Sequence, residues 1–129
     1  MRLRVLLLLV ACSKPPPPKA PVSELPADKV DQIAGRWAAN DDLDWGYTMT
    51  ITPGGSIDVW IDRGKMGRCE QKGTIAAGAT SRVFRVIYTR GECSPEAVGM
   101  PIDMTIASFT GASLTVMVAD QRRTYARAQ

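Results

Sequence analysis

The chain has 129 residues, of which 45% are hydrophobic and 22% are charged, a composition typical of one small globular domain. This size and composition exclude a multidomain assembly and a disordered chain. The formal net charge of +3 would suit a nucleic-acid-binding protein, but the charge is distributed unevenly along the sequence. The sequence contains no histidine, so the commonest general base of enzymes is missing.

The first residues have the layout of a secretory signal peptide. Basic Arg2 and Arg4 precede an apolar run over residues 5–11, which is far shorter than the roughly 20 residues needed to span a bilayer. A short apolar segment behind positive charge is typical of an export signal. We therefore expect residues 1–11 to be removed on export.

The residues around Cys12 carry a resemblance to a known class of proteins. Leu9-Val10-Ala11-Cys12 resembles the lipobox of bacterial lipoproteins. The resemblance implies cleavage before Cys12 and acylation of that cysteine, so that the membrane is one partner of the chain. It further implies a location in the bacterial cell envelope, and Ser13 after the cysteine implies the periplasmic face of the outer membrane in a Gram-negative source. The alternative is an ordinary cleaved signal peptide followed by a chance cysteine.

Residues 12–26 form the second predicted segment, a lipidated cysteine with a proline-rich spacer. The spacer, residues 13–26, holds six of the nine prolines, and proline favours extended polyproline II structure over helix or sheet. At about 3.1 Å per residue, such a spacer would hold a domain up to about 43 Å from a lipid surface. A ligand for a proline-binding module is the alternative interpretation.

Removing these segments changes the charge balance of the remainder, residues 27–129. Arg2, Arg4, Lys14 and Lys19 leave 12 of the 16 basic residues in it, and Glu24 leaves 12 of the 13 acidic ones. The domain is therefore neutral, and nothing in it supports nucleic-acid binding.

Residues 27–129 are predicted to form an all-β domain. A short helical turn is expected within 26–35, because Val30, Ile33 and Ala34 have helical spacing and Gly35 follows them. Beyond it, apolar and polar residues alternate with the period of a strand, and Pro53-Gly54-Gly55 supplies the clearest hairpin turn. The expected strands cover residues 36–39, 47–52, 57–62, 69–75, 82–90, 102–109, 114–119 and 122–127. About eight antiparallel, meandering strands can close into a small barrel, and a two-sheet β-sandwich is the alternative.

Two short motifs in this domain resemble those of lipocalin-like barrels. Gly35-Arg36-Trp37 lies at the first strand and Tyr125-Ala126-Arg127 at the last. In that family the tryptophan closes one end of the barrel and a late arginine packs on its ring. The resemblance implies a structural clasp between Trp37 and Arg127, with Arg123 as the alternative arginine.

Once Cys12 is assigned to lipid, Cys69 and Cys93 remain as an even pair in an oxidising compartment. In the chain-entropy model, a disulfide between them would stabilise the folded state by about 3.5 kcal/mol. Two free thiols or a metal site is the alternative. We expect no metal site, because two cysteines without histidine provide too few ligands.

Two surface features are candidates for binding. Trp60 shares a strand face with Asp58 and Asp62, opposite an aliphatic face, so it should lie outside the barrel or in its mouth, where it could anchor a partner. Partial burial under the N-terminal segment is the alternative. Arg63, Lys65 and Arg68 form a basic, glycine-containing turn that can attract anions or lipid headgroups, or simply be a solvated turn. The acidic residues 41–44 are expected to form a solvated loop rather than a calcium site.

No catalytic residues and no cofactor are predicted, since no motif surrounds the serines of the domain. We expect a lipid-anchored, non-catalytic binding module for a protein or an envelope component, which would use its loops and the Trp60 face. The alternative is a carrier of a small apolar ligand inside the barrel; an enzyme inhibitor or a hydrolase are further alternatives. A cavity of about 300 Å³ or more would favour the carrier. A packed core would exclude it, formed by Met49, Ile51, Ile57, Val59, Met104, Ile106, Leu114 and Val116.

Overall fold

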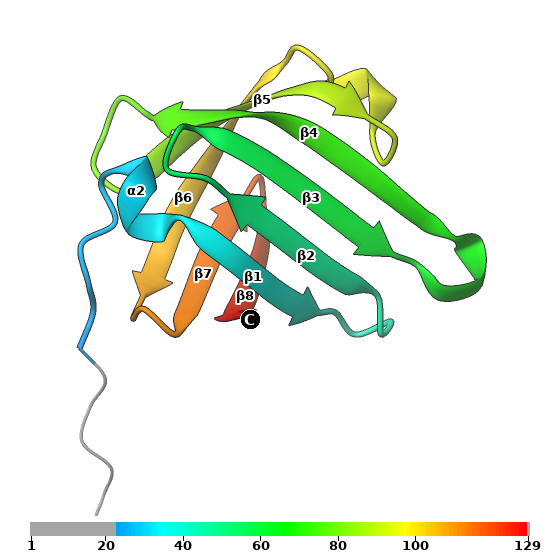
Figure 1. Cartoon of the computed structure of the whole chain (residues 1–129), viewed down its shortest axis with the longest axis horizontal. Coiled ribbons are helices and arrows are strands. Elements are labelled where there is room, and N and C mark those ends of the chain that lie inside the picture. The colour runs from blue at the N-terminus through cyan, green and yellow to red at the C-terminus, as the bar shows by residue number, and fades with distance from the viewer. Residues whose placement is uncertain (1–22, 129) are drawn as a thin grey trace, which may run out of the picture.

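The structure is a computed structural model in which residues 23–128 are described. They form an all-β domain whose eight antiparallel strands close into a barrel in the order β1 to β8 (Figure 1). Every strand pairs with its neighbours in sequence, and the circle is completed by β1 against β8. This confirms the predicted barrel and rules out the two-sheet sandwich. The predicted signal peptide, Cys12 and most of the proline-rich spacer lie outside the described residues.

The eight strands begin and end within one or two residues of the positions expected from the sequence, the helical turn lies within the expected range, and the two short 3-10 turns were not predicted. The elements are α2 Val30–Ile33, β1 Gly35–Asn40, β2 Gly46–Ile51, β3 Ser56–Asp62, η1 Gly64–Met66, β4 Arg68–Ala77, β5 Val83–Gly91, η2 Pro95–Ala97, β6 Pro101–Phe109, β7 Ser113–Val118 and β8 Gln121–Arg127.

Alternation of side chains determines which face of each strand lines the barrel. In β2, for example, Tyr47, Met49 and Ile51 are buried while the residues between them are half-exposed. The β2–β3 turn needs a glycine at position 55, where φ is +93° and a Cβ would come within 3.0 Å of the Ile75 carbonyl oxygen. Pairing of β4 with β5 shifts register between Lys72 and Gly73, a β-bulge that bends the sheet toward closure.

One end of the barrel is closed by α2 and by Trp37, whose side chain is fully buried. The indole Nε1 of Trp37 donates a hydrogen bond to the Ile33 carbonyl oxygen at 3.0 Å, and Phe109 packs edge-on with ring centroids 6.1 Å apart. The guanidinium carbon of Arg127 lies 4.2 Å from the centre of the Trp37 ring. Arg123, the alternative partner, lies instead over the ring of Tyr47.

The described chain enters the barrel at this closed end. The amide of Leu25 donates to the Phe109 carbonyl oxygen at 2.8 Å, and Glu24 pairs with Arg82 at 2.7 Å. The carboxylate of Asp28 accepts hydrogen bonds from Ser81 and from the Arg82 amide. Four contacts thus fix the residues that precede α2 against the strand ends.

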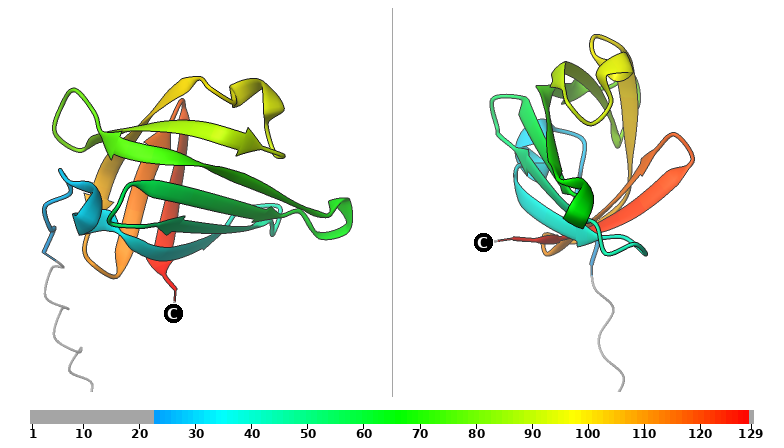
Figure 2. Two further views of the ribbon diagram at one scale, coloured as in Figure 1. Left: turned by 45° about the horizontal axis from the view of Figure 1, so that its top comes forward. Right: turned by 90° about the vertical axis from the view of Figure 1, so that its right-hand side faces the viewer.

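The opposite end, called the mouth below, is surrounded by four loops: residues 41–45, 63–67, 92–100 and 119–120. Figure 2 shows the barrel from this end in its right-hand view. The sulfur atoms of Cys69 and Cys93 lie at disulfide distance, 2.13 Å, and link the start of β4 to the 92–100 loop. Within residues 23–128, no helix has the length and hydropathy of a membrane-spanning segment.

Candidate functional site

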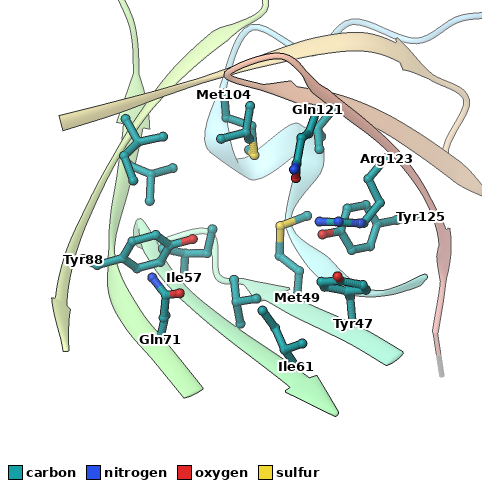
Figure 3. Close-up of a pocket in the computed structure, with 15 residues that line it drawn as sticks. Tyr47, Met49, Ile57, Ile61, Gln71, Tyr88, Met104, Gln121, Arg123 and Tyr125 are labelled. Atoms are coloured by element: carbon teal, nitrogen blue, oxygen red, sulfur yellow. The ribbon is translucent and has the colours of Figure 1, made fainter. Parts of the chain in front are cut away.

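The barrel interior is packed at its closed end and hollow toward the mouth, where a cavity of about 170 Å³ lies (Figure 3). Large side chains, among them Trp37 and Phe84, fill the closed end, whereas β2 to β8 all contribute side chains to the cavity. Its lining consists of Tyr47, Met49, Ile57, Val59, Ile61, Gln71, Val86, Tyr88, Ile102, Met104, Val116, Val118, Gln121, Arg123 and Tyr125.

The cavity is smaller than those of typical small-molecule carriers. Its 170 Å³ is below the roughly 300 Å³ at which typical small-molecule sites begin. Of the eight residues expected to fill the core, seven are buried and Val59 is half-buried. Several of them nevertheless line the cavity, so the core and the cavity share one wall.

Polar side chains also point into this largely apolar space. Figure 3 shows the Gln71 amide and the Tyr88 hydroxyl side by side on one wall of the cavity, and the Gln121 amide directed toward it from another. Among the side-chain hydrogen bonds of residues 23–128, none involves these three groups. Their donors and acceptors are therefore available to whatever occupies the cavity.

The tyrosines of the lining stay protonated at neutral pH. Burial raises the pKa of Tyr88 to about 12, with a further contribution from nearby Tyr125. Burial also raises the pKa of Tyr125, although Arg123 acts in the opposite direction. Both phenols can thus donate a hydrogen bond to a bound group.

Arg123 is the one charged residue of the cavity lining. Its guanidinium carbon lies 3.7 Å from the centre of the Tyr47 ring, a stacked cation–π arrangement. In the part of the chain that the structure describes, no carboxylate lies within 4.0 Å of it. Arg123 is therefore stacked on an aromatic face and forms no direct ion pair, although its charge acts on the Asp41 carboxylate.

Asp41 positions Tyr47 and folds the loop beside it. One carboxylate oxygen accepts a hydrogen bond from the Tyr47 hydroxyl at 2.7 Å, and the other accepts from the amides of Leu43 and Trp45, each at 2.9 Å. Burial tends to raise the pKa of Asp41, but these hydrogen bonds and the charge of Arg123 together lower it. The acidic cluster is thus a loop cap, and residues 23–128 contain no group of three side chains placed to hold a metal.

The surface predicted from Trp60, Arg63, Lys65 and Arg68 lies outside the barrel. Trp60 is 37% exposed, and the guanidinium carbon of Arg68 lies 5.1 Å from the centre of its ring. Arg63 and Lys65 lie on the β3–β4 turn, which projects beyond the strands in Figure 1. None of the four lines the cavity, so this outer surface and the cavity are separate features.

Each of three mouth loops exposes at least one large apolar side chain. Leu43 is 71% exposed, Met66 66%, Met100 59% and Val98 40%. They come from three of the four loops, and we call them the rim. A partner reaching the cavity would meet the rim first.

The sequence did not identify most of the cavity's polar residues. Gln71, Tyr88 and Gln121 were not predicted as site residues, and Arg123 was considered only as a partner for Trp37. The available signal was their place in the alternation: Arg123 pairs in register with inward-facing Val116, and Gln121 pairs with Val118. A polar residue at a core position of a strand marks such a site.

Comparison of the chain with family models, with curated proteins and with solved structures finds no significant match.

Proposed function

We propose that this protein is a non-catalytic binding protein, exported and anchored by lipid at Cys12, whose ligand site is the mouth cavity. The observation that carries the proposal is an apolar cavity of about 170 Å³ into which polar groups without protein partners converge. A packed barrel with only structural duties would fill this space with side chains.

The size of the cavity limits its occupant. A cavity of about 170 Å³ is similar in size to engineered apolar cavities of about 150 Å³ that bind benzene. The ligand is therefore a small molecule, or the end of a larger envelope component whose remainder passes over the rim. Absence of histidine from the sequence supports binding rather than catalysis.

Filling the cavity tests the proposal. Benzene is a suitable neutral probe, because it enters dry apolar cavities of similar size. We expect benzene to shift the NMR signals of the Met49 and Met104 methyl groups in the wild-type chain and not in Val118→Trp, whose indole would occupy the mouth. The matched control is Met117→Trp, one residue along β7 and outside the cavity lining, which should respond as wild type. Equal responses of both variants would overturn the assignment of the cavity.

The anchor is tested separately. The lipobox and the proline-rich spacer support acylation of Cys12, because two or three acyl chains give stable membrane attachment. We expect Cys12→Ala to move the protein from membrane to soluble fractions of the cell. If Cys12→Ala still sediments with membranes, lipid on this cysteine is not the anchor.

A second candidate function is supported by the rim. Leu43, Met66 and Met100 are large apolar side chains exposed on three of the mouth loops, and a protein partner bound at the mouth would bury them. We expect Leu43→Ser with Met66→Ser to reduce capture of an envelope protein by the immobilised chain. Trp60→Ser is the comparison variant, because it removes the exposed aromatic group of the outer surface instead. Loss of capture only in Trp60→Ser would assign the partner to that surface.

A further inference from the structure

We infer that the mouth cavity selects a small monoanion with an apolar body, of the class of short monocarboxylates, and that Arg123 is its counter-ion. This inference rests on the proposed ligand site and adds the chemical class of the ligand.

The charge of the cavity points to an anion. Arg123 contributes one positive charge to the lining, and no Asp or Glu is among the lining residues. Arg123 is half-buried and has no carboxylate within 4.0 Å, so its charge is offset only by Asp41 at longer range, and a bound carboxylate would offset it directly. The guanidinium is also the side chain whose geometry matches a carboxylate with two parallel hydrogen bonds.

Asp41 does not already fill this role. Both of its oxygens accept hydrogen bonds, from the Tyr47 hydroxyl on one side and from loop amides on the other. It lines a separate polar groove of about 270 Å³ between β1 and β8, together with Asp42, Arg122 and Arg123. The carboxylate of Asp41 thus holds the Tyr47 ring under Arg123 from outside the cavity.

Further donors surround Arg123 and face it across the cavity. The Gln121 amide and the Tyr125 hydroxyl lie on the same strand as Arg123, whereas the Gln71 amide and the Tyr88 hydroxyl lie on the opposite side of the cavity (Figure 3). Each can donate a hydrogen bond to a carboxylate oxygen. Aliphatic side chains such as Ile102 and Val118 form the rest of the wall and would contact the ligand's apolar body.

The single guanidinium argues for one negative charge. A dianion such as a phosphate monoester would place a second charge in an apolar space without a second cation, which is unfavourable. The volume of about 170 Å³ then restricts the apolar body to a short chain or one small ring.

Three probes of matched shape test the inference: hexanoate, hexan-1-ol and hexylamine, each titrated into the purified full chain at pH 7 and followed by NMR and calorimetry. We expect hexanoate to bind about tenfold or more tightly than hexan-1-ol, as a charge-assisted hydrogen bond would give. Hexylamine should bind more weakly than either. Because the comparison uses the wild-type chain alone, it does not depend on whether a variant folds.

Variants assign the preference to Arg123. Arg123→Gln should lose about tenfold in affinity for hexanoate while its affinity for hexan-1-ol stays within about twofold. Arg123→Lys keeps the charge and should keep most of the preference. Arg122→Gln, the neighbouring exposed arginine outside the cavity lining, should bind hexanoate as wild type does.

The outcomes separate the inference from the proposed function. Equal affinities for hexanoate and hexan-1-ol would overturn the anion preference and leave the cavity as a neutral ligand site. Tightest binding of hexylamine would also overturn it. Absence of binding by all three probes would overturn both the inference and the small-ligand site.

Discussion

Arg127 contacts three parts of the closed end at once. Its guanidinium lies over Trp37, Nε donates to the Gly111 carbonyl oxygen at 2.6 Å, and Nη1 donates to the Ala34 carbonyl oxygen at 3.3 Å. It therefore links the last strand, the β6–β7 turn and the residue that precedes β1. Space beside Gly35 is occupied by the same guanidinium, so a side chain there would displace it.

Replacing this arginine should weaken the fold measurably. We expect Arg127→Ala to lower the free energy of unfolding by about 2 kcal/mol, from the lost cation–π contact and hydrogen bonds. Urea denaturation followed by tryptophan fluorescence measures the change. The control is Arg122→Ala on the same strand, an exposed position at which we expect a change within about 0.5 kcal/mol. Equal losses in the two variants would show that Arg127 has no special structural role.

Tyr88 predicts how stability changes in alkaline solution. Its pKa is raised from 10.0 in the unfolded chain to about 12 in the fold, chiefly by burial. The neutral phenol is thus favoured in the folded state, so its contribution is fully present below pH 10 and is lost as pH rises toward 12. The expected loss is about 2–3 kcal/mol across that window.

Comparing unfolding of wild type and Tyr88→Phe at several pH values between 9 and 12 tests this dependence. The phenylalanine variant lacks the ionisable group and should lose less stability over the window. Parallel curves for the two proteins would mean that Tyr88 does not titrate as its burial implies.

Among the elements, the 92–100 loop depends most on a covalent link. It contains the short turn η2 and is held to β4 by Cys69–Cys93. The Glu92 amide also donates to the Glu70 carbonyl oxygen, and the Glu70 amide donates to the Glu92 carboxylate. Beyond the disulfide, the Gly99 amide donates to the Tyr88 carbonyl oxygen at 2.8 Å, so the loop also borders the cavity. A conformational change in this loop should therefore alter the mouth of the barrel.

Removing the link tests that dependence. Cys69→Ser with Cys93→Ser should lower the free energy of unfolding by about 3–4 kcal/mol, because the unfolded chain regains the entropy of the closed loop. Amide exchange of residues 92–100 should rise more than that of β2 or β3. Cys12→Ala, which leaves both cysteines in place, should unfold as wild type does. Unchanged stability of the double variant would show that the pair contributes little.

The sequence predicted elements well and side-chain environments less well. Strict alternation in β2 and β3 made those strands recognisable, because one face is buried and the other is wet. β4 breaks this pattern: Cys69, Glu70 and Gln71 are all buried in succession. Glu70 faces the outside of the barrel, and its burial depends on the 92–100 loop that packs beside it. The local sequence pattern around Glu70 carries no information about this distant segment.

At the scale of the whole molecule, closure of the barrel depends on a narrow seam. β1 and β8 are in register only at Trp37 with Arg127 and at Ala38 with Ala126, and the Ala128 amide adds a bond to the Arg36 carbonyl oxygen at 2.7 Å. By contrast, β3 and β4 pair along the whole of β3. Toward the mouth, β1 and β8 diverge around the polar groove, so the seam should open before other strand pairs.

Hydrogen exchange in the native state measures this difference. We expect amides of β1 and β8 that bond across the seam to exchange through openings of lower free energy than amides between β3 and β4. Exchange at pH 7, residue by residue, gives both values in one sample. Equal protection throughout would indicate that the barrel opens only by global unfolding.

Closure itself is a non-local property that the sequence supports but does not determine. Eight alternating segments suit both a barrel and a sandwich. The choice depends on pairing between β1 and β8, the first and last strands in the sequence. The cavity is harder still to foresee. It exists because Trp37, Phe84 and α2 fill one end, while the residues near the mouth leave space that no strand pattern reveals.

The fixed N-terminal segment has a mechanical consequence. Leu25 and Asp28 are bound to strand ends at the closed end, and the mouth lies at the other end of the barrel. A tether attached upstream of residue 23 would therefore hold the barrel by its closed end. Tension on this tether would act first on the contacts to Phe109 and Arg82. The rim at the opposite end would stay accessible to a ligand that approaches the mouth.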